Sequence, residues 1–301
     1  MVEAGAVAFS DDGLPVSDGQ VFRLACEYAK MFGVPVINHA EDPRIRKNGV
    51  MHEGTVSAKI GLAGNPDVAE SSMVNRDLEL SVLTGTHLHV PHVSAEKSVQ
   101  HLRKTLEFSK SISSEVTPHH LYFNHESLHS FDTSFKVAPP IRGEKDRLAL
   151  ISAVKEGIIT CIATDHAPHT LEEKSDTYLK SPSGGPLIQF SLPLLLQLNH
   201  QNKIKLEDIV QKTSHNLSTL FQIKDRGYIR EGYYADLVLF DLDTKTKVSE
   251  EVIHSKCGWS PLKNETFNSR VMHTIVSGNH IYNNGKINGE PESMRLEFER
   301  D

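Results

Sequence analysis

Short apolar runs alternate with helical patterns along the first two thirds of this 301-residue chain. The runs are nearly continuously apolar, as strands of a sheet covered on both faces are. Strands that alternate with helices build parallel βαβ units, so the sequence predicts an α/β fold. The predicted strands lie at residues 6–9, 34–38, 87–93, 111–116 and 158–164, and the predicted helices at residues 18–31, 65–83, 95–108, 144–156 and 187–199. The helix at 18–31 has an apolar stripe with helical spacing, formed by Val21, Leu24, Tyr28 and Met31.

The pattern changes after about residue 223, where β-type runs are punctuated by glycine and asparagine. Two such runs, at 270–277 and 280–282, flank the turn Gly278-Asn279. A small sheet region is therefore expected after the α/β region. The predicted domains are residues 1–223 for the part with the candidate site, 224–289 for the small β segment, and 290–301 for a charged, frayed tail.

Four of the predicted strands end close to a side chain that can bind a metal ion. These side chains are Asp12, His39, His92 and Asp165. In a parallel barrel all strand carboxyl ends point to one face, so the four could converge. Imidazole and carboxylate together suit Zn²⁺, with Mn²⁺ or Co²⁺ as substitutes. Taken singly, each has a simpler interpretation: Asp-Gly favours an ordinary turn, and a strand histidine is commonly a hydrogen-bonded core residue.

The segment from Thr164 to His169 reads TDHAPH and places one carboxylate and two imidazoles within five residues. At the tip of a buried strand such groups could bind a metal, transfer a proton or hold an anion. A polar loop with surface histidines is the alternative.

Composition excludes several classes of function. The net charge of −7 provides no basic surface for nucleic acid. No apolar run approaches the roughly 20 residues of a membrane span. The first residues lack the basic start of a signal peptide. The three cysteines, Cys26, Cys161 and Cys257, form no CxxC motif, which favours a reducing cytoplasm.

Several motifs together resemble the type I dihydroorotases of the amidohydrolase superfamily. They occur in the order and near the spacings of that family, and the resemblance extends to residues 231–236 (EGYYAD). The motifs are residues 8–13 (AFSDDG), 38–41 (NHAE), 89–94 (HVPHVS), 115–121 (EVTPHHL), 139–143 (PPIRG) and 163–169 (ATDHAPH).

The resemblance implies a TIM-barrel metal-dependent hydrolase with a small C-terminal β-sandwich segment. It implies reversible hydrolysis of (S)-dihydroorotate to N-carbamoyl-L-aspartate in pyrimidine biosynthesis, with two zinc ions. Asp12 would bridge the ions, His39 and His92 would bind one, and Asp165 would bind the other and shuttle the proton. By the same resemblance, four positions would lie at the substrate: His169 at its carboxylate, the backbone of Ser183 and Gly184 at the pyrimidine ring, and Ala138 at a base-reading position.

The chain also departs from the family pattern. No His-x-His precedes Asp12, and the predicted strands correspond to about five of the eight barrel strands. Ala138 stands where the family often has asparagine, and residues 186–189 read PLIQ instead of continuing toward Gly-x-Glu. We therefore expect a truncated chain that is weakly active or inactive alone.

Two alternatives to a dihydroorotase follow from these departures. The chain could be a hydantoinase-like or allantoinase-like cyclic amidohydrolase. It could be a non-catalytic partner of a transcarbamoylase. As protein partners we consider a second copy, in a homodimer, or a transcarbamoylase.

Overall fold

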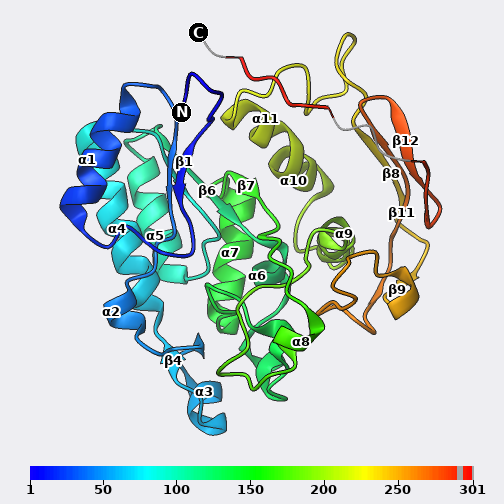
Figure 1. Cartoon of the computed structure of the whole chain (residues 1–301), viewed down its shortest axis with the longest axis horizontal. Coiled ribbons are helices and arrows are strands. Elements are labelled where there is room, and N and C mark those ends of the chain that lie inside the picture. The colour runs from blue at the N-terminus through cyan, green and yellow to red at the C-terminus, as the bar shows by residue number, and fades with distance from the viewer. Residues whose placement is uncertain (290–293, 300–301) are drawn as a thin grey trace. The chain divides into compact units, whose positions relative to one another are not determined.

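The computed structural model describes residues 1–289 and 294–299, and the chain forms two compact units, Met1–Ile188 and Gln189–Asp301 (Figure 1). All the predicted site residues fall in the first unit. The helices between residues 191 and 220 pack within the second unit, so the end of the barrel part at 223 stays a prediction. Within the predicted tail, residues 290–293 and 300–301 lie outside the described residues, and Phe298 forms an antiparallel bridge with Ile223.

The first unit is built on a five-stranded parallel sheet, as the sequence predicts. Its strands lie in the order β1-β2-β5-β6-β7, so chain order is also spatial order. Consecutive parallel neighbours are the arrangement of a (β/α) barrel segment. The strands are β1 (Phe9–Asp11), β2 (Val36–Asn38), β5 (Leu88–Val90), β6 (Ile112–Val116) and β7 (Cys161–Ile162).

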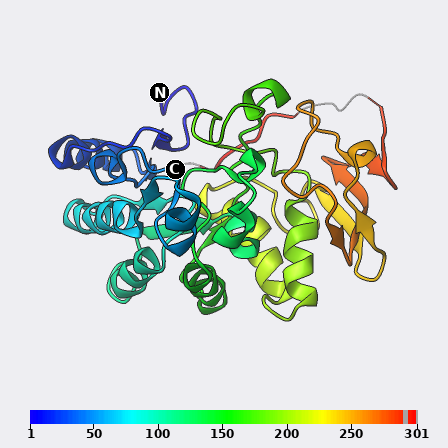
Figure 2. The same ribbon diagram turned by 90° about the horizontal axis from the view of Figure 1, so that it is seen from below.

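Four long helices connect these strands and form one layer beside the sheet, which Figure 2 shows as a row. Neighbouring helices pack in the order α1, α4, α5, α7. The helices are α1 (Gly19–Lys30), α4 (Asp67–Thr84), α5 (Glu96–Leu106) and α7 (Glu144–Glu156). The shorter elements of this unit are α2 (Pro43–Arg46), β3 (Met51–His52), α3 (Thr55–Ile60), β4 (Gly64–Asn65), α6 (Pro118–Tyr122), η1 (His125–Leu128), η2 (Thr133–Phe135) and α8 (Leu171–Lys174).

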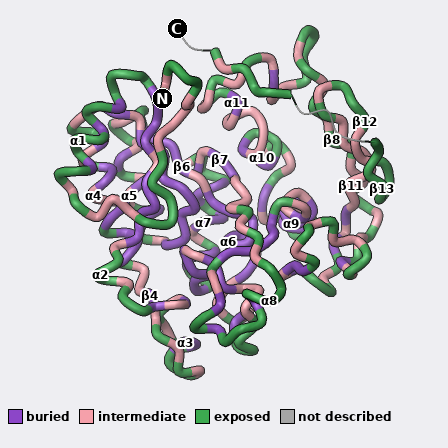
Figure 3. Tube along the Cα trace, in the orientation of Figure 1, coloured by how far each residue is buried: buried purple, intermediate pink, exposed green. Residues whose placement is uncertain are grey.

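The apolar stripe that the sequence predicts on α1 does not pack into the core. Helix α1 buries Phe22, Cys26 and Ala29, and the predicted stripe is exposed. The guanidinium of Arg76 on α4 lies 5.4 Å from the centre of the Phe22 ring. Phe22 therefore lies on the face of α1 that contacts α4. Figure 3 shows the outer side of α1 as exposed.

In its described residues, the second unit contains three α-helices, a short π-helical segment, a short 3-10 helix and antiparallel strands. Its four-stranded sheet has the order β13-β12-β11-β8, and β11 turns into β12 at Ser277-Gly278, close to the predicted turn. The antiparallel arrangement confirms the predicted small C-terminal sheet. The elements are α9 (Ser191–His200), α10 (Leu206–Val210), η3 (Gln211–His215), α11 (Asn216–Leu220), β8 (Leu237–Asp241), β9 (Thr246–Lys247), η4 (Glu250–Val252), β10 (Thr266–Phe267), β11 (Arg270–Val276), β12 (Asn279–Asn283) and β13 (Lys286–Ile287). Among the described residues, no helix combines the length and apolar character that crossing a membrane requires.

Candidate metal centre

Three of the four predicted metal-binding side chains meet at the carboxyl ends of β1, β2 and β5. The Nδ1 atom of His39 lies 3.1 Å from Nε2 of His92 and 3.3 Å from Oδ1 of Asp12. The same Asp12 oxygen lies 3.4 Å from Nε2 of His92. Both imidazoles are buried, whereas Asp12 is exposed. Within the described parts of the chain this is the one group of three or more such side chains with converging ligand atoms.

The segments that carry these side chains are fixed by the ends of their strands. His39 follows the last residue of β2, and its backbone N–H donates to the Asp11 carbonyl at the end of β1. The side chain of the preceding Asn38 accepts from the Val16 N–H at 3.0 Å and donates to Asp77 at 2.7 Å. The chain is therefore held firmly where it leaves the sheet.

Two of the predicted ligands have a backbone conformation that is uncommon for residues with a side chain. His92 has φ of +32° and Asp165 has φ of +49°. Such positive values favour glycine, and strained residues cluster at functional sites. Both residues lie just beyond strands, His92 after β5 and Asp165 after β7.

Charge within the cluster is mutually stabilising. Hydrogen bonds with His39 and His92 hold the pKa of Asp12 far below its usual range. Burial opposes a charge on His39, but the carboxylates of Asp12 and Glu41 raise its pKa to about 9. The Glu41 carboxylate lies 3.9 Å from Nε2 of His39, on the side of the ring away from Asp12.

Asp165 lies within electrostatic range of this cluster. Burial raises the pKa of Asp165, His92 opposes that rise, and Asp12 and Glu115 add to it. A half-buried carboxyl group with a raised pKa is suited to accept and release a proton. Asp165 is therefore placed beside the trio without being one of its converging ligand atoms.

The donor set fits a divalent cation. In a tetrahedral site with bonds of about 2.1 Å, neighbouring ligand atoms are about 3.4 Å apart. The three separations between ligand atoms in this trio, 3.1, 3.3 and 3.4 Å, are close to that value. Two imidazole nitrogens and one carboxylate oxygen are also ligands that Zn²⁺ prefers.

One carboxylate near the site was not singled out from the sequence. Glu115 on β6 accepts from Nε2 of His89 at 3.1 Å and from the backbone N–H of His92 at 3.4 Å. The pKa of Glu115 is lowered, since these contacts outweigh its burial. A single glutamate in the predicted strand at 111–116 was a weak signal, because the sequence does not show which side chains it meets.

The predicted substrate residues lie on the segments after β7 and before α7. The Nε2 atom of His169 lies 2.9 Å from the carbonyl oxygen of Ser183. Gly184 has φ of +124°, and a Cβ there would lie 2.6 Å from the carbonyl oxygen of Ala167. Ala138 is half-buried, and the peptide bond that joins it to Pro139 is cis.

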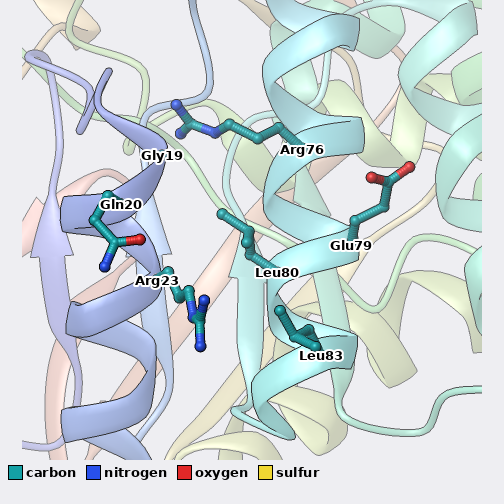
Figure 4. A pocket seen from close by; sticks show the side chains of 7 residues that line it. All are labelled: Gly19, Gln20, Arg23, Arg76, Glu79, Leu80 and Leu83. Carbon is teal, nitrogen blue, oxygen red and sulfur yellow. The ribbon is translucent and has the colours of Figure 1, made fainter.

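A hollow of about 540 Å³ lies elsewhere in this unit, between α1 and α4. It contains none of the predicted site residues, and Figure 4 shows Arg23 of α1 and Leu83 of α4 at its walls.

The comparisons with known proteins agree with this arrangement. The model of the amidohydrolase family matches residues 1–281. The chain therefore belongs to the amidohydrolase family, whose members are metal-dependent hydrolases. Among curated proteins it is 38% identical over 281 residues to a dihydroorotase of Anaplasma phagocytophilum (strain HZ). It is 39% identical over 277 residues to a dihydroorotase of Carboxydothermus hydrogenoformans. The predicted family resemblance is thus confirmed.

The matches cover most of this chain but only part of each relative. The alignments span 93% and 92% of the chain and 63% and 64% of the two relatives. Among solved structures, an L-hydantoinase (dihydropyrimidinase) from Arthrobacter aurescens is 26% identical with a TM-score of 0.84, covering 96% of this chain and 68% of that one. A dihydropyrimidinase from Brevibacillus agri NCHU1002 is 24% identical with a TM-score of 0.81, covering 93% and 64%. These likenesses support the predicted barrel-type fold.

Proposed function

We propose that this chain carries the metal site of a dihydroorotase, an enzyme that hydrolyses (S)-dihydroorotate reversibly to N-carbamoyl-L-aspartate in pyrimidine biosynthesis. The observation that carries the proposal is the convergence of Asp12, His39 and His92 at adjoining strand ends. The relatives named dihydroorotase, at 36–39% identity, support this substrate over other cyclic amides.

Zn²⁺ is the metal we propose, held by the Asp12, His39 and His92 side chains. In a full-length enzyme of the family, Asp12 would also bridge to a second ion bound by Asp165, whereas this chain would hold one ion tightly. A bound divalent cation lowers the pKa of water to about 7 and polarises a carbonyl group, which an amide needs because it is a poor electrophile. The exposure of Asp12 beside two buried imidazoles leaves one side of the trio accessible to a small molecule.

Asp165 is the proposed proton carrier. Its carboxylate takes a proton from the attacking water and gives it to the ring nitrogen as the C–N bond breaks. The hydroxyl oxygen ends in the new carboxyl group, and the nitrogen leaves as part of the carbamoyl group. The raised pKa of Asp165 favours holding that proton between the two transfers.

His169 is the proposed contact to the substrate carboxylate, and the backbone of Ser183 and Gly184 the proposed contact to the pyrimidine ring. The 2.9 Å separation of His169 Nε2 and the Ser183 carbonyl supports one shared site for these groups. Ala138 has no polar side chain, so any contact there would use its backbone.

A hydantoinase-like activity is the second candidate. The hydantoinase and dihydropyrimidinase structures share the fold, but at 26% identity or less they support that substrate weakly. A homodimer or a transcarbamoylase partner stays a prediction. So does a cytoplasmic location, which three cysteines that form no disulfide support.

Steady-state assays of the zinc-loaded protein with dihydroorotate, hydantoin and allantoin test the proposal. We expect at most weak hydrolysis by this chain alone, with dihydroorotate hydrolysed in preference to the other two. A preference for hydantoin or allantoin would contradict the dihydroorotase assignment and favour the second candidate.

A further inference from the structure

Two lysine side chains are buried next to the loop that follows α8. Lys136 is 5% exposed and Lys174 is 6% exposed. Lysine is almost never so buried unless its ammonium group has specific partners. Both lysines are far from Asp12, His39 and His92 in the sequence, and neither has a part in the proposed reaction. The hydrogen-bond partners of the two ammonium groups therefore indicate the role of these lysines.

The ammonium group of Lys136 donates to three backbone carbonyls of this loop. It contacts the carbonyl oxygens of Tyr178 at 2.6 Å, Leu179 at 3.0 Å and Ser181 at 2.6 Å. The backbone carbonyl of Lys136 in turn accepts from the Gly184 N–H at 2.9 Å. Three donors matched to three carbonyls use the full capacity of an ammonium group.

The ammonium group of Lys174 donates to the next part of the same loop. It contacts the carbonyl oxygens of Pro182 at 3.0 Å and Gly184 at 3.1 Å. The backbone carbonyl of Lys174 also accepts from the Thr133 hydroxyl, which ties it to the segment that carries Lys136. The two lysines together therefore bind five carbonyls within residues 178–184.

The fixed loop in turn meets His169. Between the carbonyls bound by Lys174 lies that of Ser183, which is 2.9 Å from Nε2 of His169. Gly184 packs so closely on Ala167 that a side chain would not fit. The Ala167 N–H also donates to the Gly185 carbonyl at 3.1 Å. The other ring nitrogen, Nδ1, lies 3.6 Å from the Glu173 carboxylate on α8. Any displacement of the loop would therefore move one of the partners of the His169 ring, the Ser183 carbonyl.

We propose that the ammonium groups of Lys136 and Lys174 form a clamp that fixes the backbone of residues 178–184 and thereby orients His169. They are positioning residues, since they act through the loop and do not touch the reacting atoms. The clamp rests on the contacts alone, whereas its consequence for dihydroorotate rests on the proposed function.

Hydrogen exchange tests the clamp without any need for turnover. Lys136→Met and Lys174→Met should each speed amide exchange in residues 178–185 by roughly tenfold or more, because charge-assisted hydrogen bonds are lost. The matched control is Lys180→Met, which removes an exposed lysine from the same loop and should leave exchange unchanged. Unchanged exchange in both clamp variants would overturn the proposal.

The effect on the substrate site has its own measurements. Lys174→Met should shift the ring ¹⁵N resonances of His169, and it should raise KM for dihydroorotate roughly tenfold while kcat changes less than about threefold. A fall in kcat with KM unchanged would overturn the positioning role. Turnover of hydantoin or allantoin without turnover of dihydroorotate in the unaltered zinc-loaded protein would instead refute the proposed function and leave the exchange result to decide the clamp.

The unaltered protein provides a test that does not depend on the variants folding. Ammonium protons held by carbonyls exchange slowly with water, whereas those of exposed lysines exchange too fast to observe. Lysine-selective ¹H–¹⁵N spectra should therefore show protected ammonium signals for Lys136 and Lys174, beside any signal of Lys212, which is also buried. Absence of the Lys136 and Lys174 signals would contradict the clamp.

Discussion

The Nδ1 atom of His39 lies 3.1 Å from the Nε2 atom of His92, although 53 positions separate the two residues in the chain. Their rings are buried at the ends of neighbouring parallel strands, and one oxygen of Asp12 is within 3.4 Å of both nitrogens. Strand order therefore brings three ligand atoms to one point. This convergence underlies the metal site and the predictions that depend on it.

The first prediction concerns metal affinity. Each purified chain should bind one Zn²⁺ tightly, and His39→Ala should weaken that binding by more than about 100-fold, since even residues behind the ligands cost 10–100-fold. Calorimetric titration with Zn²⁺ measures both values. His200→Ala, which removes an exposed histidine, is the control and should bind normally. Unchanged affinity in His39→Ala, or two tightly held ions per chain, would contradict this prediction.

The second prediction concerns proton transfer. Asp165→Asn should lower kcat for dihydroorotate by roughly 10²–10⁴-fold, because an amide cannot accept the proton of the attacking water. The Zn²⁺ held by the trio should remain, since Asp165 is not one of its three converging ligands. Parallel kinetics and metal analysis separate the two effects. Near-normal turnover of the variant would refute the role of Asp165.

The third prediction concerns pH and stability. Burial lowers the pKa of His120 to about 4, and its ring contacts the Thr117 hydroxyl at 2.7 Å and the Pro139 carbonyl at 3.1 Å. In the unfolded chain a histidine has a pKa of about 6.5, so below that pH the unfolded state binds more protons. The stability from neutral His120 is therefore present above about pH 6.5 and is lost as the pH falls toward 4.

Urea unfolding at pH 7.5 and pH 5 measures this loss. The unaltered protein should lose about 2 kcal/mol more than His120→Gln between the two values. His200→Gln serves as the control and should follow the unaltered protein. An equal loss in His120→Gln and the unaltered protein would show that His120 is not the responsible group.

The fourth prediction concerns a buried ion pair behind the site. Arg142 donates to Ser94 Oγ at 2.8 Å and pairs with Glu70 at 3.4 Å, and both charges are buried. Removing one partner of such a pair costs about 3–5 kcal/mol, because the other charge stays buried. Arg142→Met should therefore lower the free energy of unfolding by that amount. Arg103→Met, at the exposed pair with Glu156, should cost less than about 1 kcal/mol, and equal costs would contradict the distinction.

The convergence of side chains at the strand ends was predictable from the sequence, because it follows from two simple rules. An apolar run identifies a buried strand, and parallel connections bring successive carboxyl ends to one edge. Asp12, His39 and His92 meet for that reason. The inner face of α1 was not predictable in the same way. That helix has apolar residues on two faces, and only contact with α4 selects Phe22 over Val21.

The lysine clamp could not be predicted from the sequence at all. Lysine is normally exposed, and Lys136 and Lys174 are 38 positions apart with no motif that links them. Their partners are backbone carbonyls, which every residue has, so no pattern of side chains reveals the contact. Glu115 was missed for a related reason, because its contacts are with His89 on the neighbouring strand β5 and with His92 just beyond that strand.

The most direct test of the metal site is anomalous diffraction at the zinc absorption edge from crystals of the protein grown with Zn²⁺. We predict a strong peak about 2.0–2.2 Å from Nδ1 of His39, Nε2 of His92 and a carboxylate oxygen of Asp12. A zinc-loaded crystal with no peak among these three side chains would contradict the metal site and the hydrolase function built on it.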